Sequence, residues 1–377
     1  SLKNKIKINK ISLNKKIRKK PMPSRKALGT KERKKIFEVL NYYKKKNVDP
    51  GYQGFFENIF CKKFSKIMGG GYADAVATGT SAIYVALAAL ELPKKSDVLV
   101  SPVTDPGTIS AIILNDLKPK LLDSHKNSYD INIEEIKKRS NKKTSCILVV
   151  HSLGRPTPMR DIVKFAKKKL IKILEDCSQA HGAKISGKRV GAFGDVAAFS
   201  TMYRKTTITG ASGGVVYTKN KELYKKVLAY ADRGKPRWKK NFDDRNPSQY
   251  LFPALNLHTD EISCAIGISS LERLDKVRNA RFKYVKEVSN LLKNYSKCCL
   301  PYGCSKNDSP FTYPIIVKTE RIKLSKINFA KEILKEGIGL NPHYQYLVED
   351  WLWVRKYLRD NYKTKNARKV RDKSFNL

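Results

Sequence analysis

An acid and a lysine stand where they could share one cofactor. The run IKILEDC at 171–177 is apolar and ends in acids, which predicts a buried parallel strand that carries Asp176 to its carboxyl edge. Ligands of open α/β sheets bind at that edge. Lys205 follows twenty-nine residues later, between the apolar run VAAFST and the Gly-rich segment TGASGG. An acid that keeps a pyridine nitrogen protonated and an amine that attacks an aldehyde indicate pyridoxal phosphate as the cofactor.

Three motifs around these residues make the pattern more specific. They read EDCSQAHGA, then G-x-x-x-G-x-F-G-D, then F-S-x-x-x-x-K-x-x-x-x-G. Together they resemble the DegT/DnrJ/EryC1/StrS family of sugar aminotransferases, and the resemblance covers roughly residues 30–350. It implies that Asp176 is the partner of the ring nitrogen and that Lys205 binds the cofactor covalently. It also implies that Gln179 lies near the cofactor ring and that the Ser200 hydroxyl binds the phosphate.

The turn ATGTSA at 77–82 joins a predicted strand to a predicted helix. Gly79 permits a tight turn, and the N–H groups of Thr80 and Ser81 at the helix start could hold a phosphate with the helix dipole behind them. Threonine and serine are also ordinary helix caps, so the motif alone leaves both interpretations open. The resemblance favours the phosphate, because in the family this turn binds the cofactor phosphate.

The substrate side departs from the family pattern at two positions. Asp105 stands where the family has an aromatic residue that stacks on the cofactor ring, and an aspartate cannot stack in that way. Ser212 lies in the Gly-rich segment where the family usually has a glutamate. The substrate-side candidates are Asp105, Tyr203, Ser212, His343 and Tyr344.

Asn256 points to a shared active site. It matches a family asparagine that reaches the cofactor phosphate of the neighbouring subunit, and we expect it to open the long helix that follows. The resemblance therefore implies a homodimer with active sites at the subunit interface. His258 replaces the arginine of the family segment. His181 fits either a base or a structural hydrogen bond, and the structural role is the commoner one for a lone histidine.

Strands and helices alternate from residue 73 to Asp176, which indicates a parallel sheet covered by helices on both faces. The resemblance implies fold type I of the pyridoxal-phosphate enzymes, an α/β fold. Its large domain holds a mostly parallel seven-stranded sheet, and a smaller α+β domain follows. We predict a basic, flexible arm at 1–25, the large domain at 26–255 and the small domain at 256–377, with a basic tail from residue 363.

The composition bears on partners and compartment. The net charge is +43, and lysine is spread over nearly every predicted helix and both ends of the chain. A nucleic-acid binder gathers such charge beside groove-reading or aromatic motifs, so we do not expect nucleic acid as the partner. Seven cysteines without C-x-x-C pairs indicate free thiols and no metal site. With no apolar run near the ~20 residues that span a bilayer and no secretory signal, we expect a cytoplasmic protein.

The sequence thus predicts a pyridoxal-phosphate aminotransferase. It would move an amino group from an amino acid such as glutamate to a nucleotide-linked keto sugar in surface-polysaccharide or amino-sugar biosynthesis. A sugar dehydratase of the same family is the first alternative, but those enzymes commonly carry histidine at the position of Lys205. The second alternative is a regulatory, nucleic-acid-binding protein on the same scaffold, which would not need to keep Asp176, Gln179, Ser200 and Lys205 together.

Overall fold

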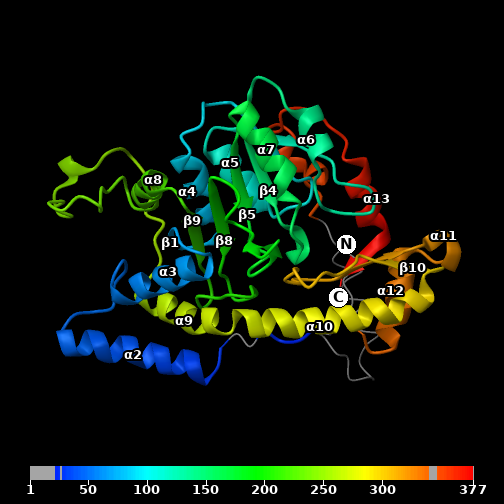
Figure 1. Cartoon of the computed structure of the whole chain (residues 1–377), viewed down its shortest axis with the longest axis horizontal. Helices are drawn as coiled ribbons and strands as arrows, with labels where there is room; N and C mark the ends of the chain where they lie inside the picture. The colour runs from blue at the N-terminus through cyan, green and yellow to red at the C-terminus, as the bar shows by residue number, and fades with distance from the viewer. Residues whose placement is uncertain (1–21, 26–27, 339–345, 377) are drawn as a thin grey trace.

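A seven-stranded sheet forms the centre of the molecule (Figure 1). The computed structural model describes residues 22–25, 28–338 and 346–376. The strand order is β1-β9-β8-β5-β4-β2-β3. The strands are β1 (Tyr72–Val76), β2 (Asp97–Val100), β3 (Lys118–Leu121), β4 (Thr144–Val150), β5 (Lys172–Asp176), β8 (Val196–Ser200) and β9 (Gly214–Thr218). Six of these strands run in one direction, and β9, which lies between β1 and β8, runs antiparallel to both. The predicted α/β fold with a mostly parallel seven-stranded sheet is confirmed, and β9 is the strand that runs opposite to its neighbours.

Helices cover both faces of this sheet. One face carries α4 (Gly79–Ala89), α5 (Pro106–Leu114) and α8 (Lys221–Ala231). The other carries α3 (Phe55–Ile67), α6 (Ile133–Arg139), α7 (Met159–Lys169) and α9 (Glu261–Glu272). Successive side chains of a strand point to opposite faces, so Leu148 and Val149 of β4 join different core clusters. Strands buried on both faces explain the continuous apolar runs in the sequence.

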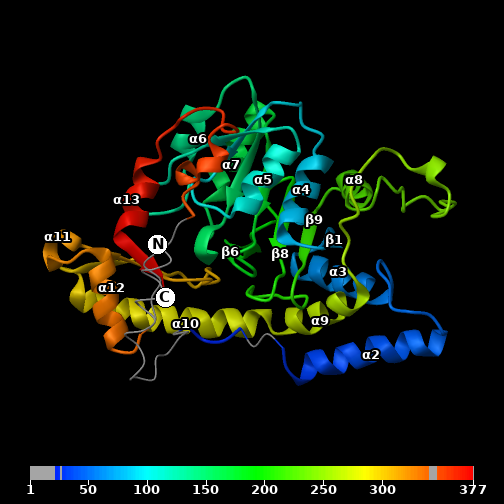
Figure 2. The same ribbon diagram turned by 180° about the vertical axis from the view of Figure 1, so that it is seen from behind.

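A second, three-stranded antiparallel sheet lies at one end of the molecule, where Figure 2 shows α10 to α13. Its strands are β10 (Cys299–Pro301), β11 (Pro314–Val317) and β12 (Ser374–Asn376). The helices around it are α10 (Leu274–Leu292), α11 (Thr319–Ile322), α12 (Lys326–Lys335) and α13 (Lys365–Lys373). Met22 packs into the apolar cluster that this sheet forms with its helices. Residues 22–25, at the end of the predicted arm, are therefore docked, while residues 1–21 lie outside the described ranges.

The remaining elements are short or peripheral. Helix α2 (Thr30–Lys46) packs against α9. A small hairpin joins β6 (Lys184–Ile185) and β7 (Lys188–Arg189). Single 3-10 turns occur at Ser152–Gly154, Pro247–Gln249, Lys293–Tyr295, Val348–Asp350 and Leu352–Val354. Across the described ranges, no helix has both the length and the apolar character needed to cross a bilayer.

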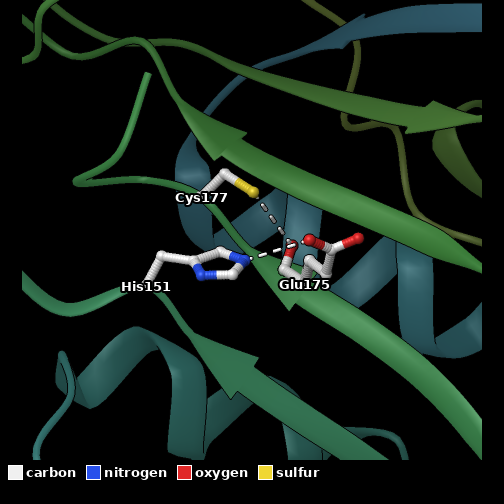
Figure 3. Close-up of side chains that lie close together, drawn as sticks. All are labelled: His151, Glu175 and Cys177. Atoms are coloured by element: carbon white, nitrogen blue, oxygen red, sulfur yellow. Dashed lines mark hydrogen bonds and ion pairs between the residues drawn. The ribbon is translucent and has the colours of Figure 1, made fainter. Parts of the chain in front are cut away.

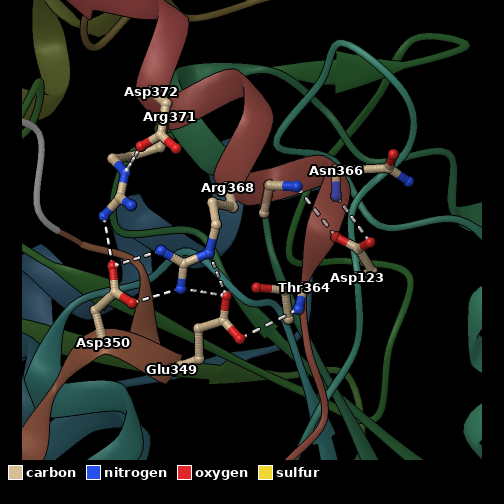
Figure 4. A network of polar contacts seen from close by, with 9 residues as sticks. Asp123, Glu349, Asp350, Thr364, Asn366, Arg368, Arg371 and Asp372 are labelled. Carbon is tan, nitrogen blue, oxygen red and sulfur yellow. Dashed lines mark hydrogen bonds and ion pairs between the residues drawn. The ribbon is translucent and has the colours of Figure 1, made fainter.

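Residues from 363 onward do not form the predicted basic tail. Figure 4 shows α13 bound by polar contacts to two other parts of the chain. Arg368 Nη2 donates to Glu349 Oε1 at 2.7 Å and to Asp350 Oδ1 at 2.5 Å. The carboxylate of Asp123 accepts the amides of Asn366 and Ala367 at the start of the helix, where negative charge is favoured. Arg368, Arg371 and Lys373 are thus paired with acids, and β12 completes the small sheet.

The long amphipathic run after the polar loop is divided into two helices. Asp260 caps α9 by accepting the amide of Ser263 at 2.8 Å, and α9 ends at Glu272 before α10 begins at Leu274. The prediction that Asn256 opens the helix is wrong. Asn256 lies four residues before the cap, in an extended segment that forms a β-bridge with Asp232.

Candidate active site

Asp176 ends β5 at the carboxyl edge of the sheet and is held there by two donors. The Thr108 hydroxyl on α5 donates to Asp176 Oδ2 at 3.2 Å, and the Ser178 amide donates to Oδ1 at 3.0 Å. Asp176 is nearly fully buried. Two bonds on one buried carboxylate fix its orientation. Thr108 was not predicted, although a threonine in the first turn of a helix that follows a strand end is a usable signal in the sequence.

Lys205 lies in the turn that follows β8. Its amide donates to the Met202 carbonyl at 2.9 Å, and its Nζ is 4.6 Å from the ring centroid of Phe311. Burial lowers the pKa of Lys205 below its usual value, while the charges of Asp176 and Asp105 act in the opposite direction. An amine with a lowered pKa is neutral more often, and only the neutral amine attacks an aldehyde or takes up a proton. Phe311 comes from the small sheet's side and was not predicted.

The start of α4 lies against the end of β8. A Cβ atom added to Gly79 would be 2.5 Å from Cβ and 2.9 Å from Oγ of Ser200, so glycine is required by this close approach. Thr78 is the N-cap, and its Oγ1 accepts the Ser81 amide at 2.8 Å. The expectation of a free N–H at Ser81 is therefore wrong, because the cap occupies it. Within the described residues the amides of Gly79 and Thr80 donate no such bond, and Gly79 lies beside the Ser200 hydroxyl.

The starts of α4 and α5 lie next to each other. A Cβ on Gly107 would be 2.2 Å from Thr80 Oγ1, which places the Thr80 side chain against the first turn of α5. Asp105 caps α5 by accepting the Gly107 amide at 2.8 Å, and it is exposed. Its carboxylate influences the pKa of Lys205, so it lies near the amine. Asp105 cannot stack on a ring, and the structure gives it a capping role.

Gln179 fixes a neighbouring loop. Its Oε1 accepts the amide of Leu153 at 2.6 Å, and the Leu153 carbonyl in turn accepts the amide of Phe311 at 2.9 Å. Gln179 thus connects the end of β5 to the segment that brings Phe311 to Lys205. Its predicted place beside a cofactor ring stays a prediction.

His151, Glu175 and Cys177 form a buried group whose ligand atoms lie within 4.8 Å of one another (Figure 3). His151 Nδ1 accepts the Thr157 amide, so its Nε2 carries the proton donated to Glu175 at 3.0 Å. Glu175 also accepts three backbone amides, from Gly191, Phe193 and Gly194. Burial alone would raise the pKa of Glu175, but the bonds from His151 and these amides hold it below its usual value. The carboxylate's acceptor positions are used, so the group serves as a structural hydrogen-bond network rather than a metal site.

The other predicted residues take varied positions. Ser212 Oγ donates to the Ala77 carbonyl at 2.7 Å and so fixes the Gly-rich segment to the end of β1. Tyr203 is 51% exposed beside the lysine turn. Burial, followed by the charge of Lys205, lowers the pKa of His181 to about 3, so it is neutral at physiological pH and acts as a packing residue. His343 and Tyr344 lie outside the described residues.

Asn256 belongs to a charged segment around Asp232. The fully buried Asp232 carboxylate accepts the Arg233 Nε at 2.8 Å and lies near Lys235, Arg237 and His258. His258 stacks on Tyr52 at 3.5 Å between ring centroids. Asn256 is exposed, and its side chain forms no hydrogen bond within the described part of the chain. Its amide is therefore available to a group outside this subunit.

These contacts test whether pyridoxal phosphate suits the site. The residues Asp176, Lys205, Thr80, Ser200 and Gly79 gather where β5, β8, α4 and α5 meet. The glycine at 79 keeps the space beside the Ser200 hydroxyl open, and the amides of Gly79 and Thr80 offer donors backed by the α4 dipole. An acid and a lysine of lowered pKa supply the two functional groups that the cofactor's ring nitrogen and aldehyde need. The residues present fit the cofactor.

Comparison with known proteins supports the same assignment. The profile of the DegT/DnrJ/EryC1/StrS aminotransferase family matches residues 32–377. GDP-perosamine synthase of Escherichia coli O157:H7 is 31% identical over 245 residues, which cover 64% of this chain and 65% of that protein. An aminotransferase structure from Psychrobacter cryohalolentis superposes with a TM-score of 0.84 at 22% identity, covering 95% of this chain and 93% of that one. The GDP-4-keto-6-deoxy-D-mannose-3-dehydratase of E. coli with bound hydrated PLP gives 0.83 at 24% identity, with coverage of 96% and 95%.

Proposed function

The chain belongs to the DegT/DnrJ/EryC1/StrS aminotransferase family, and we propose that it transfers an amino group from an amino acid to a nucleotide-linked keto sugar with pyridoxal phosphate as cofactor. The observation that carries the proposal is that Asp176, fixed by two donors, and the half-buried Lys205 lie at one edge of the sheet, where the charge of Asp176 acts on the pKa of Lys205. Glutamate is the proposed donor. The product would enter surface-polysaccharide or amino-sugar biosynthesis, and the proposed compartment is the cytoplasm.

The residues of this chain have distinct tasks in that reaction. When bound, pyridoxal phosphate supplies an electron sink for the carbanion formed beside the amino group. Lys205 acts as the base that accepts the proton from the α-carbon of the donor, for which its lowered pKa is suited. Asp176 holds the proton on the ring nitrogen, and Thr108 and Ser178 keep its carboxylate oriented. The amides at the α4 start and the Ser200 hydroxyl hold the phosphate.

The relatives support a sugar substrate without fixing which one. They include GDP-perosamine synthase and a dTDP-3-amino-3,6-dideoxy-alpha-D-galactopyranose transaminase of Aneurinibacillus thermoaerophilus, and both names specify nucleotide sugars. A diphosphate carries negative charge, which a chain with a net charge of +43 would attract. We therefore keep a nucleotide-linked keto sugar as the substrate class.

A dehydratase is the second candidate, because GDP-4-keto-6-deoxy-D-mannose 3-dehydratase of Yersinia pseudotuberculosis is among the relatives. Removal of a sugar hydroxyl needs an acid-base residue in place of a covalently bound lysine. This chain has Lys205 at that position, which favours amine transfer.

Mass spectrometry distinguishes these functions. The cofactor-loaded protein is incubated with glutamate labelled with ¹⁵N and with a panel of keto nucleotide sugars. We expect the label in one sugar product, with loss of transfer in Lys205→Ala and normal transfer in the control Lys219→Ala, which changes an exposed lysine. A product that has lost a hydroxyl without gaining nitrogen would favour the dehydratase. A protein that takes up no pyridoxal phosphate would contradict both.

We further propose a homodimer with shared active sites. Large apolar side chains on α2 are exposed, among them Phe37 at 64% and Leu40 at 43%, and a partner subunit would cover them. The free amide of Asn256 suits a contact with the partner's phosphate. Mixing Lys205→Ala with Asn256→Asp protein should then restore activity, because one site of each heterodimer is free of both changes. If activity stays at the parental levels despite demonstrated subunit exchange, Asn256 does not serve the partner.

A further inference from the structure

Arg25 and Arg281 both bind the carbonyl of Phe311, the residue whose ring lies over Lys205, and neither forms an ion pair with a carboxylate among the described residues. Burial lowers the pKa of Arg25 to about 10, and the charge of Arg204 adds to the effect. Burial, followed by the charge of Arg25, lowers the pKa of Arg281 to about 9. Arg25 also lowers the pKa of Lys205, although less than burial does. Arg25 is therefore the common neighbour of three other cations at one side of the site.

The two arginines differ in how their donors are used. Arg281 is almost completely buried and binds the carbonyls of Pro310, Pro23 and Phe311. Arg281 is thus a structural residue that holds the Phe311 segment in place. Arg25 donates from Nη2 to the same Phe311 carbonyl at 2.7 Å, and its Nε is buried without a hydrogen-bond partner among the described residues. A guanidinium has five N–H donors, so Arg25 retains donors for another acceptor.

Phe311 connects Arg25 to the reacting centre. The guanidinium carbon of Arg25 lies 4.7 Å from the ring centroid of Phe311, and Lys205 Nζ lies 4.6 Å from the same centroid. Both cations thus touch one aromatic ring. A group bound by Arg25 would therefore be separated from the Lys205 amine, which carries out the proton transfer, by the ring of Phe311.

Arg25 is half-buried, and its Nε is shielded from water without a counter-ion, which is unfavourable; an anion that pairs with the guanidinium removes this cost. The planar fork of arginine matches the two oxygens of a carboxylate or a phosphate. We propose that Arg25 recognises an oxyanion of the substrate, either a carboxylate of the amino donor or a phosphate of the nucleotide sugar. The inference rests on the proposed aminotransferase function and adds the residue that selects an anionic substrate.

The test compares Arg25→Gln and Arg25→Lys with Arg33→Gln, which changes an exposed arginine on α2. Calorimetry on the cofactor-loaded proteins measures the affinity for two unreactive probes, succinate and inorganic pyrophosphate. We expect Arg25→Gln to weaken the binding of one probe by about tenfold or more, because a charged hydrogen-bond pair is lost. The affinity of Arg25→Lys for this probe should lie between those of Arg25→Gln and wild type, and the affinity of Arg33→Gln should equal that of wild type. Loss of succinate binding identifies the donor carboxylate, and loss of pyrophosphate binding identifies the sugar nucleotide.

Steady-state kinetics provides the second readout. The KM for the matching substrate should rise in Arg25→Gln by a factor similar to the probe affinity, while kcat changes less than about threefold. The inference is overturned if both probes bind Arg25→Gln as they bind wild type. It is also overturned if cofactor uptake falls in parallel with probe binding, because Arg25 would then only hold Phe311. Arg25-dependent probe binding in a protein that transfers no amine would reject the proposed function and leave the oxyanion site standing.

Discussion

Replacing Thr108 by valine tests the contact that orients the catalytic carboxylate. Thr108→Val keeps the shape of the side chain and removes the hydroxyl that donates to Asp176 Oδ2. Hydrogen bonds to charged groups contribute about 1.5–3 kcal/mol. At 3.2 Å this bond is long for an O–H donor, so the low end applies. A loss of about 1.5 kcal/mol corresponds to roughly tenfold weaker binding of pyridoxal phosphate.

The same substitution has a second effect, which a double variant separates. The Thr104 hydroxyl donates to Thr108 Oγ1 at 2.9 Å, and Thr104 is buried. Thr108→Val leaves this donor without its partner, which should lower the free energy of unfolding of the apoprotein by about 1–3 kcal/mol. Thr104→Val/Thr108→Val removes the stranded donor as well. It should recover stability but not cofactor affinity.

Two measurements on the same proteins decide the matter. Absorbance titration of the apoprotein gives the cofactor Kd, and urea unfolding gives the stability. The reasoning is refuted if Thr108→Val binds the cofactor within about twofold of wild type, since the contact to Asp176 would then contribute little. It is also refuted if the double variant regains both the stability and the cofactor affinity of wild type, because the weaker binding would then come from the Thr104 hydroxyl that lacks a hydrogen-bond partner.

Three further outcomes follow from the geometry and the charges. Gly79→Ala places a Cβ 2.5 Å from Cβ of Ser200, so the free energy of unfolding should fall by about 1–3 kcal/mol and the cofactor Kd should rise. The control Gly51→Ala, whose added Cβ meets no atom within 4 Å, should change neither quantity. Equal cofactor Kd values for Gly79→Ala and wild type would contradict this prediction. Burial raises the pKa of Asp74 in the folded protein, so the protein loses stability as the pH rises above the pKa of this group in the unfolded chain. Asp74→Asn should therefore lose less stability than wild type between pH 5 and 8. Urea unfolding that shows the same loss for both proteins would contradict this prediction. Burial lowers the pKa of Lys205, so at a pH below the ordinary pKa of lysine the unfolded apoprotein binds more protons than the folded one. Lys205→Met should therefore be more stable than the wild-type apoprotein near pH 7, and the difference in the free energy of unfolding should narrow toward pH 10.

The motifs along the chain determined the family, the α/β class and the central pair of residues. The family's function requires an acid at a strand end and a lysine after the next inner strand, and both are local features that need no knowledge of folding. Alternating apolar runs then fix a parallel sheet, because only strands buried on both faces are continuously apolar. The pattern does not reveal that β9 runs in the opposite direction, since a buried apolar strand has the same composition whichever way it runs.

Tertiary structure decided the contacts between distant segments. Thr108 meets Asp176, 68 residues away, and Phe311 meets Lys205 from the unit of the small sheet, so no spacing in the sequence reveals either pair. The Ser81 amide was assigned wrongly because a cap one turn earlier competes for the same donor. The segment after residue 363 has the composition of a solvated tail, yet acids from elsewhere in the chain neutralise its arginines and allow it to pack. Local sequence records which groups are present, and the fold alone determines which of them are paired, because pairing depends on segments that meet only after the sheet has formed.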